Sequence, residues 1–206
     1  MPYSLADLRT RTRDLLNEAT AAFFTDAQLD RFLADAALDI SGVVRCVEDS
    51  TLIELALNDI DYALPTDCIE VVHVQEAATG RGLPKITATM GGHSSSDTEG
   101  DTALRYFVWE RTLFVEPSPN AAAVGKTLRV FYFRETTDVT LLPQYAQHLA
   151  VSYACTLAKL QDKLPGEAAV FWSMYTNGVA FRRTDTYEHT PHALDELMMA
   201  EEAVSG

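Results

Sequence analysis

The spacing of hydrophobic residues predicts a long helix over residues 141–164, LLPQYAQHLAVSYACTLAKLQDKL. Large apolar side chains recur there in steps of three and four, which is the period of one helix face. Pro143 suits the first turn and Pro165 ends the helix, because proline has no N–H to donate inside a helix. The positions on this face are Leu142, Tyr145, Leu149, Tyr153, Thr156 or Leu157, Leu160 and Leu164.

Two shorter helices are predicted before this one. Ser4 with Asp7, and Thr25 with Gln28, have the spacing of helix-capping pairs. The apolar stripe of the first helix is Leu5, Leu8, Leu15 and Leu16. That of the second is Leu29, Phe32, Leu33, Ala36, Ile40, Val43, Val44 and Val47. The outward face of the second helix, either solvated or between subunits, consists of Asp30, Arg31, Asp35 and Asp39.

Residues 51–133 change to the period of β-strands. Five runs rich in β-branched and aromatic residues are bounded by Gly, Pro, Asn or Asp, as strands are. Hairpin turns are predicted at Gly80–Gly82 and at Glu110–Arg111. Apolar residues on both faces of the last run predict a sheet that is covered on both sides. The runs are residues 51–57, 68–75, 103–109, 112–116 and 127–133.

A fourth helix is predicted over residues 165–183. It carries two apolar stripes, so it is covered on more than one side. One cover is the 141–164 helix, and the other is either the sheet or a neighbouring copy of the chain. If Trp172 is buried, its truncation to Ala costs about 3–5 kcal/mol. The stripes are Ala168, Trp172, Tyr175 and Val179, and Phe171, Met174, Gly178 and Phe181.

Two segments stand outside this pattern. Residues 90–101, MGGHSSSDTEGD, have no periodicity and are expected to protrude as a loop. After Arg183 the chain has no Lys or Arg, and its apolar face is short. Such a segment is too short to stay helical alone in water, so it folds either on its own domain or on a partner.

These elements predict an α+β protein. A helical bundle of two N-terminal and two long C-terminal helices receives an inserted antiparallel β block, a small sandwich or barrel of five to seven strands. An extended acidic C-terminal tail follows. The predicted boundaries are 1–49 for the N-terminal helices, 50–135 for the β block, 136–185 for the C-terminal helices and 186–206 for the tail.

Length and charge narrow the class of protein. A chain of 206 residues with 47% hydrophobic residues can bury a core. No apolar run reaches the 18 or so residues of a membrane helix, and the N-terminus lacks the apolar region of a secretory signal. The net charge of −14 disfavours tight nucleic-acid binding, because binding phosphates requires Lys and Arg. The separated Cys46, Cys68 and Cys155 are interpreted as free thiols in a reducing cytosol.

No catalytic or cofactor site is predicted. Residues 124–127, VGKT, end like a phosphate-binding loop, but Asn120 stands where the motif needs Gly and the run enters a strand. His189 and His192 have no carboxylate or thiol at ligand spacing, so no metal site follows. Neither a nucleophile elbow nor a Cys–His pairing can be argued from the spacing. We therefore expect no enzymatic activity and no bound cofactor.

Several stretches carry a family resemblance. Residues 62–71, YALPTDCIEV, follow the pattern Tyr-x-Leu-Pro-x-Asp-Phe at a strand entry, with Cys68 in place of the aromatic residue. Leu142-Pro143-x-Tyr145 opens the long helix. In the order helix–helix, β block, helix–helix, the chain resembles the head-to-tail adaptor (connector) proteins of tailed bacteriophages. The remaining matching stretches are residues 4–18, 24–40, 104–119 and 127–135.

The resemblance implies a virion structural protein rather than an enzyme. Such proteins form a ring, usually dodecameric, beneath the portal protein, where they join the capsid vertex to the tail and line the DNA passage. The implied partners are further copies of the chain, the portal protein and the downstream tail (nozzle or tube) protein. Double-stranded DNA passes without sequence-specific binding, and no membrane is involved. The protein is expected at the head–tail interface of the virion after assembly in the host cytoplasm.

On this hypothesis each contact surface has candidate residues. The portal-docking residues are Leu194, Leu197, Met198 and Met199. The inter-subunit helix faces contain Phe171, Met174, Phe181, Asp35 and Asp39. The tail-side loop contains Gly91, Gly92, His93 and Asp97. Two alternatives stay open, a tail-completion or terminator ring protein and an acidic DNA-mimic inhibitor; a small hydrolase would lack any candidate triad.

Overall fold

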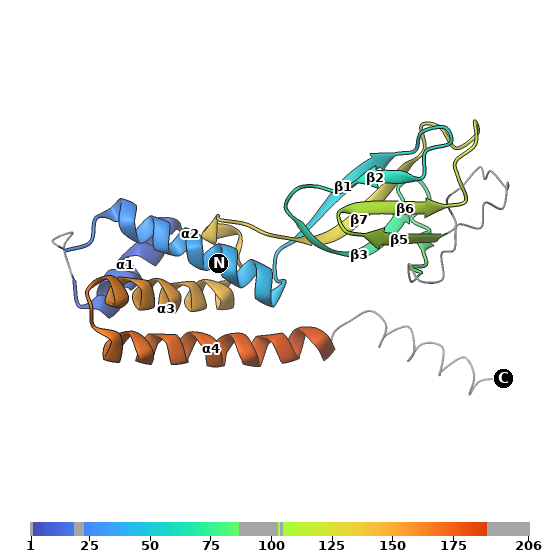
Figure 1. Ribbon diagram of the computed structural model, residues 1–206. Helices are drawn as coiled ribbons and strands as arrows, with labels where there is room; N and C mark the ends of the chain where they lie inside the picture. The colour runs from blue at the N-terminus through green and yellow to red at the C-terminus, as the bar shows by residue number, and fades with distance from the viewer. Residues whose placement is uncertain (1, 19–22, 87–102, 104, 189–206) are drawn as a thin grey trace. The chain divides into compact units, whose positions relative to one another are not determined.

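The computed structural model describes residues 2–18, 23–86, 103 and 105–188 (Figure 1). The chain divides into two compact units. The helical unit draws its described residues from Met1–Cys46 and Thr136–Gly206, and the β unit draws its own from Val47–Glu135. Four α-helices and antiparallel sheets confirm the mixed α+β class.

Local capping explains where the first two helices of the helical unit begin. Both predicted capping boxes are confirmed, Ser4 with Asp7 and Thr25 with Gln28, and each satisfies backbone N–H groups that the first turn leaves unpaired. The helical elements are α1 (Leu5–Leu16), α2 (Asp26–Val44), the 3-10 turn η1 (Val139–Leu141), α3 (Gln144–Gln161) and α4 (Pro165–Glu188).

The most deeply buried face of α3 is not the row of large residues that its period predicts. Leu142, which precedes the helix, is buried as expected, but Leu160 and Leu164 are exposed. Small residues permit close helix packing, so α1 and α2 lie against the alanine-rich side. The large residues instead face α4 and are only half-buried. The buried residues of α3 are Ala146, Gln147, Ala150, Val151, Ser152, Ala154, Cys155, Thr156 and Ala158.

Gln147 is a fully buried polar residue on α3. Its Oε1 accepts a hydrogen bond from Tyr3 N–H at 2.8 Å. Its Nε2 donates to the carbonyl oxygens of Tyr3 at 3.3 Å and Val139 at 3.2 Å. A buried amide with its donors and acceptor satisfied adds no desolvation penalty, and here it fastens the N-terminal segment to the middle helix of the unit.

The β unit consists of two antiparallel sheets. One has four strands in the order β1-β7-β3-β4, and the other has three in the order β2-β6-β5. The predicted tight hairpin is confirmed between β5 and β6, where Trp109 pairs with Thr112 and Glu110 has a positive φ of 53°. The strands are β1 (Glu48–Glu54), β2 (Asp61–Ala63), β3 (Cys68–Glu76), β4 (Gly82–Leu83), β5 (Arg105–Trp109), β6 (Thr112–Glu116) and β7 (Thr127–Arg134).

Alternate side chains of both sheets meet in one hydrophobic core. In β7, Leu128, Val130 and Tyr132 are buried, while Phe131 on the opposite face is half-buried. Leu52 of β1 lies on that opposite face and is exposed. The prediction that the sheet is covered on both sides is therefore wrong at β1, because no described residue buries Leu52. The core residues are Leu55, Tyr62, Leu64, Val71, Val74, Leu83, Ala103, Tyr106, Leu113, Val115, Ala123, Leu128 and Val130.

Candidate assembly surfaces

The outer face of α4 is apolar and open. Ala168 and Tyr175 point inward and are buried. Phe181 is 66% exposed on the outer face, where Val170 and Met174 are exposed as well. Trp172 is 47% exposed but lies on the side of α4 that is turned toward α3. The condition for a large cost of truncating Trp172, its burial, is therefore not met, and the truncation does not remove a core residue. Between Gly166 and Phe181 the sequence carries one charged residue, Glu167, which is ion-paired with Lys159 at 2.7 Å.

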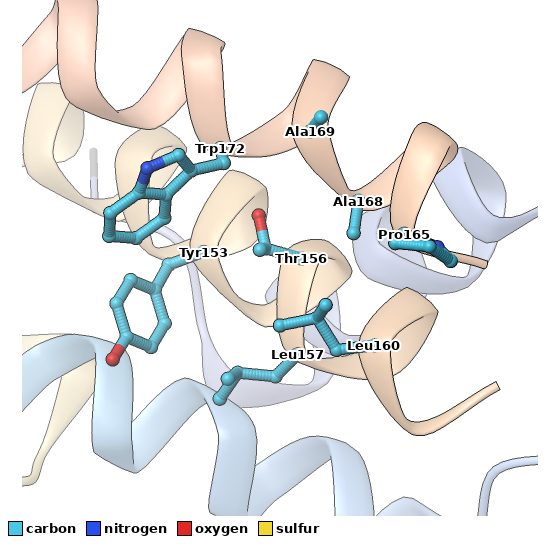
Figure 2. A pocket seen from close by; sticks show the side chains of 8 residues that line it. All are labelled: Tyr153, Thr156, Leu157, Leu160, Pro165, Ala168, Ala169 and Trp172. Atoms are coloured by element: carbon cyan, nitrogen blue, oxygen red, sulfur yellow. The ribbon is translucent and has the colours of Figure 1, made fainter. Parts of the chain in front are cut away.

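A groove of about 350 Å³ runs between α3 and α4 (Figure 2). The rings of Tyr153 and Trp172 stand at one end, with their centroids 6.2 Å apart. The hydroxyl of Thr156 donates to Ser152 O at 3.0 Å, so it offers the groove no free donor. The groove can therefore hold an apolar side chain but has little to recognise a charged one. Its lining residues are Tyr153, Thr156, Leu157, Leu160, Pro165, Ala168, Ala169 and Trp172.

A polar contact between two side chains joins α4 to α2. The hydroxyl of Tyr175, a residue that is 3% exposed, donates a hydrogen bond to the Asp39 carboxylate. Burial raises the pKa of Tyr175, and the hydrogen bond to Asp39 raises it further, because a buried phenolate next to a carboxylate is unfavourable. Asp39, a candidate for the inter-subunit face, is thus bound inside its own chain, whereas Asp35 is exposed.

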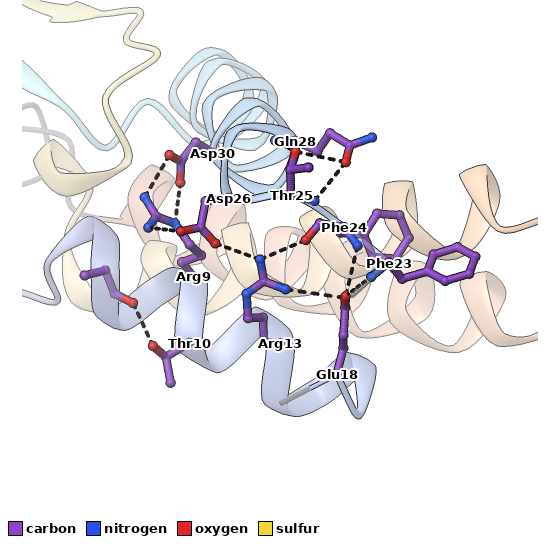
Figure 3. Close-up of polar contacts among 11 residues, drawn as sticks. Arg9, Thr10, Arg13, Glu18, Phe23, Phe24, Thr25, Asp26, Gln28 and Asp30 are labelled. Atoms are coloured by element: carbon purple, nitrogen blue, oxygen red, sulfur yellow. Dashed lines mark hydrogen bonds and ion pairs between the residues drawn. The ribbon is translucent and has the colours of Figure 1, made fainter. Parts of the chain in front are cut away.

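A polar cluster joins α1 to the start of α2 (Figure 3). Arg9 binds Asp30 with two nitrogens, at 2.9 and 2.8 Å, and Asp26 at 3.0 Å. Arg13 donates to Phe24 O at 2.9 Å and to Asp26 at 2.7 Å. This cluster was not predicted from the sequence, although a signal for it is present. Arg9 and Arg13 are four residues apart, as are Asp26 and Asp30, and residues at this spacing lie on one helix face.

The same cluster holds an exposed aromatic residue in place. The Glu18 carboxylate accepts hydrogen bonds from the backbone N–H groups of Phe23 and Phe24, the latter at 2.9 Å. Phe24 is buried, but Phe23 is 68% exposed and points away from the cluster in Figure 3. Two amides fixed by one carboxylate leave the backbone at Phe23 little freedom.

The three-stranded sheet presents aromatic residues on its outer face. Phe107 and Phe114 are cross-strand partners whose rings stack with centroids 4.7 Å apart. Trp109 continues the row and is 59% exposed. At the other end, Arg105 pairs with Glu116 at 2.7 Å. Such a row is the kind of surface that Trp and Phe form in protein contacts.

The predicted contact residues differ in exposure, and some of them lie outside the described residues. Of the helix-face candidates, Phe171 is half-buried, while Met174 and Phe181 are exposed on α4. The portal-docking candidates Leu194, Leu197, Met198 and Met199, and the loop candidates Gly91, Gly92, His93 and Asp97, lie outside the described residues. Within the described part of the chain, no group of three or more His, Cys, Asp or Glu residues could hold a metal ion. No described helix is long and apolar enough to cross a membrane.

Comparison with known families agrees with the order of these elements. Residues 3–194 match the family described as SU10 adaptor protein. The chain belongs to this family. No match was found among curated proteins. The chain is thus a phage adaptor structural protein, and membership of the family implies a place in the virion and interaction with portal and tail proteins.

Proposed function

We propose that this adaptor acts as a closed ring of identical copies, twelve in number, that docks beneath the portal and joins the capsid vertex to the tail. The observation that carries the proposal is the outer face of α4. It exposes Val170, Met174 and Phe181 and is almost free of charge. An exposed apolar surface depleted of charged residues has the composition of an interface core. In a ring, each copy covers such a face on the next copy.

The contact is heterologous, because a closed ring joins two different faces of the chain. On one side, Phe171, Met174 and Phe181 of α4 supply the apolar surface. On the other side we place α2, around the exposed Asp35. Asp39 contributes indirectly, since its hydrogen bond to Tyr175 holds α4 in position.

The two ends of the ring are assigned from the sequence and the family. The C-terminal segment of the chain docks on the portal through Leu194, Leu197, Met198 and Met199. The β unit, a small sandwich, faces the downstream tail protein together with the loop that contains Gly91, Gly92, His93 and Asp97. The net charge of −14 suits a passage for double-stranded DNA, because like charge prevents the DNA from sticking.

The first test is the mass of the purified adaptor in solution, alone and with the portal protein. We expect a multi-copy complex when the portal is present. Met174→Glu with Phe181→Glu, both at exposed positions, should abolish the complex and leave the thermal midpoint unchanged. Leu57→Glu, at an exposed position of the β unit, is the matched control and should assemble as the wild type does.

The outcomes separate the candidate functions. A chain that stays monomeric with the portal would overturn the ring. Co-purification with a tail-tube protein instead of the portal would support a tail-completion ring, and displacement of DNA from a nuclease would support a DNA mimic. If the α4 double variant assembles normally, the interface lies elsewhere on the chain.

A further inference from the structure

β1 forms one edge of the four-stranded sheet, and among the described residues no strand pairs with its outer side. The backbone of Leu55 exchanges hydrogen bonds with Lys126 and Gly125, and Val47 O accepts from Arg134 N–H. Odd-numbered residues of β1 therefore turn their backbone groups toward β7, the strand that pairs with it. It follows that the even-numbered residues turn theirs toward the free edge. These are Glu48, Ser50, Leu52 and Glu54, and all four are exposed.

The chain closes only part of this edge. Asp49 Oδ1 accepts the outward N–H of Ser50 at 2.7 Å, and the same carboxylate is held by Arg134 at 2.6 Å. Among the described residues, no backbone bond is recorded for the outward groups of Leu52 and Glu54. Long open edges pair readily with other strands, and proteins normally cover or shorten them. A seven-residue edge strand with an exposed Leu52 next to its central residue is therefore available to an added strand.

Charge argues against a second copy of this chain as that strand. When two β1 strands overlap fully in antiparallel order, Glu48 stands opposite Glu54, and like charges across strands are unfavourable. Other strands of this chain would also place acidic residues beside β1. The edge strand β2 begins with Asp61, and the part of β3 that β4 does not pair with contains Glu70.

Two edge segments among the described residues carry basic side chains, residues 81–85 and the start of β5 at Arg105, and they close each other. Pro84 has no N–H, and its carbonyl oxygen accepts from Tyr106 N–H at 3.1 Å. Tyr106 O in turn accepts a hydrogen bond from Ile86 N–H at 2.8 Å. These two hydrogen bonds occupy the outer backbone groups of Tyr106 in β5. By sequence, residues 87–102 and 184–206 contain no Lys or Arg at all. The chain thus holds no open basic strand to complement its own β1.

We propose that β1 accepts an extended, positively charged strand from a different virion protein, which adds to the four-stranded sheet with Lys or Arg opposite Glu48 and Glu54. Main-chain hydrogen bonds to Leu52 and Glu54 supply affinity, and the two acids select the partner. This inference rests on the proposed function, because it needs the adaptor to stand beside other proteins in the virion.

The test uses assembled virions in which Ser50 is replaced by the photo-cross-linker p-benzoylphenylalanine. We expect a cross-link to a segment of another virion protein that contains Lys or Arg. Adding Leu52→Pro removes an outward N–H that the fold does not use, and proline is tolerated at such edge positions. It should reduce the cross-linked fraction by about tenfold or more, corresponding to the loss of main-chain bonding. Leu52→Thr keeps the N–H and should stay within about twofold of the parent.

A second variant guards against misfolding by proline. Glu48→Lys with Glu54→Lys leaves the backbone intact and should reduce the cross-link as strongly as Leu52→Pro does. Cross-links to another copy of the adaptor, to no protein, or to a partner that is insensitive to these variants would overturn the inference while leaving the proposed function standing. Absence of the adaptor from virions would overturn both.

Discussion

Gly178 of α4 lies directly against the side chain of Leu149 of α3, so closely that a Cβ at Gly178 would overlap Leu149 Cδ2. An alanine here would therefore require the Leu149 side chain to move, and space rather than backbone conformation favours glycine. About one turn further, toward the C-terminus of α3 and the N-terminus of α4, Tyr153 meets Tyr175, with ring centroids 5.1 Å apart. The contact between Gly178 and Leu149 limits how closely α4 can approach α3.

Gly178→Ala should lower the free energy of unfolding of the helical unit by up to about 2 kcal/mol, because overpacking against Leu149 costs about 1–3 kcal/mol and the better helix propensity of alanine returns about 1 kcal/mol. The measurement is urea unfolding followed by the fluorescence of Trp172, with Trp109→Phe to silence the only other tryptophan. Gly42→Ala is the control: no atom lies within 4 Å of the added Cβ, so this helix-interior change should stabilise by up to about 1 kcal/mol. Equal effects of the two substitutions would contradict the close contact.

Leu149→Ala should relieve the overlap. In that background Gly178→Ala should cost less than it does in the wild type, giving a coupling free energy of about 0.5–3 kcal/mol between the two positions. The measurement is a double-mutant cycle: urea unfolding of the wild type, the two single variants and the double variant. Strict additivity would show that Gly178 is needed for some other reason.

Tyr175→Phe should destabilise the helical unit by about 1–3 kcal/mol, because it removes the hydrogen bond to Asp39 and leaves a carboxylate short of a donor. Tyr153→Phe, at a half-buried ring in contact with Tyr175, is the matched control and should have the smaller effect. Thermal unfolding of the two variants side by side gives the comparison. A larger loss in Tyr153→Phe would place the main α2–α4 contact elsewhere.

The same tyrosine should make stability depend on alkaline pH. Its pKa is raised in the folded state, so its contribution is complete below the unfolded value of about 10 and is lost as pH rises toward the folded value. Wild-type stability should therefore fall more steeply than that of Tyr175→Phe between about pH 9.5 and 11. Other groups whose pKa is raised, such as Cys46 with a pKa of about 11, are present in both proteins. Their effects therefore cancel in the difference between the two stability curves. Parallel curves would argue against a buried phenol at this position.

Glu18→Ala should release the segment at Phe23, because Glu18 accepts the N–H groups of both Phe23 and Phe24. We expect a loss of about 1–3 kcal/mol in the free energy of unfolding and faster amide exchange at these two residues. Asp14→Ala, on the exposed face of α1, should change neither quantity. Unaltered exchange at Phe24 in Glu18→Ala would show that Arg13 alone holds this turn.

Local signals in the sequence were sufficient to predict where α1 and α2 begin and where the β5–β6 hairpin turns. The pairs Ser4–Asp7 and Thr25–Gln28 act within one helical turn, and Glu110–Arg111 acts within one hairpin, so each could be recognised without knowing the rest of the fold. The order of elements also carried the family resemblance, which the match over residues 3–194 confirms.

Which face of each element is buried was decided only by the tertiary structure. In α3 the row of large residues and the row of alanines have the same helical period, and the sequence does not show that α1 and α2 pack on the alanines while α4 meets the larger residues. The closeness of Leu149 and Gly178 and the open edge of β1 likewise depend on neighbours far away in the chain. Periodicity determines that a face exists; contacts between distant segments determine what covers it, and what is left for other proteins to bind.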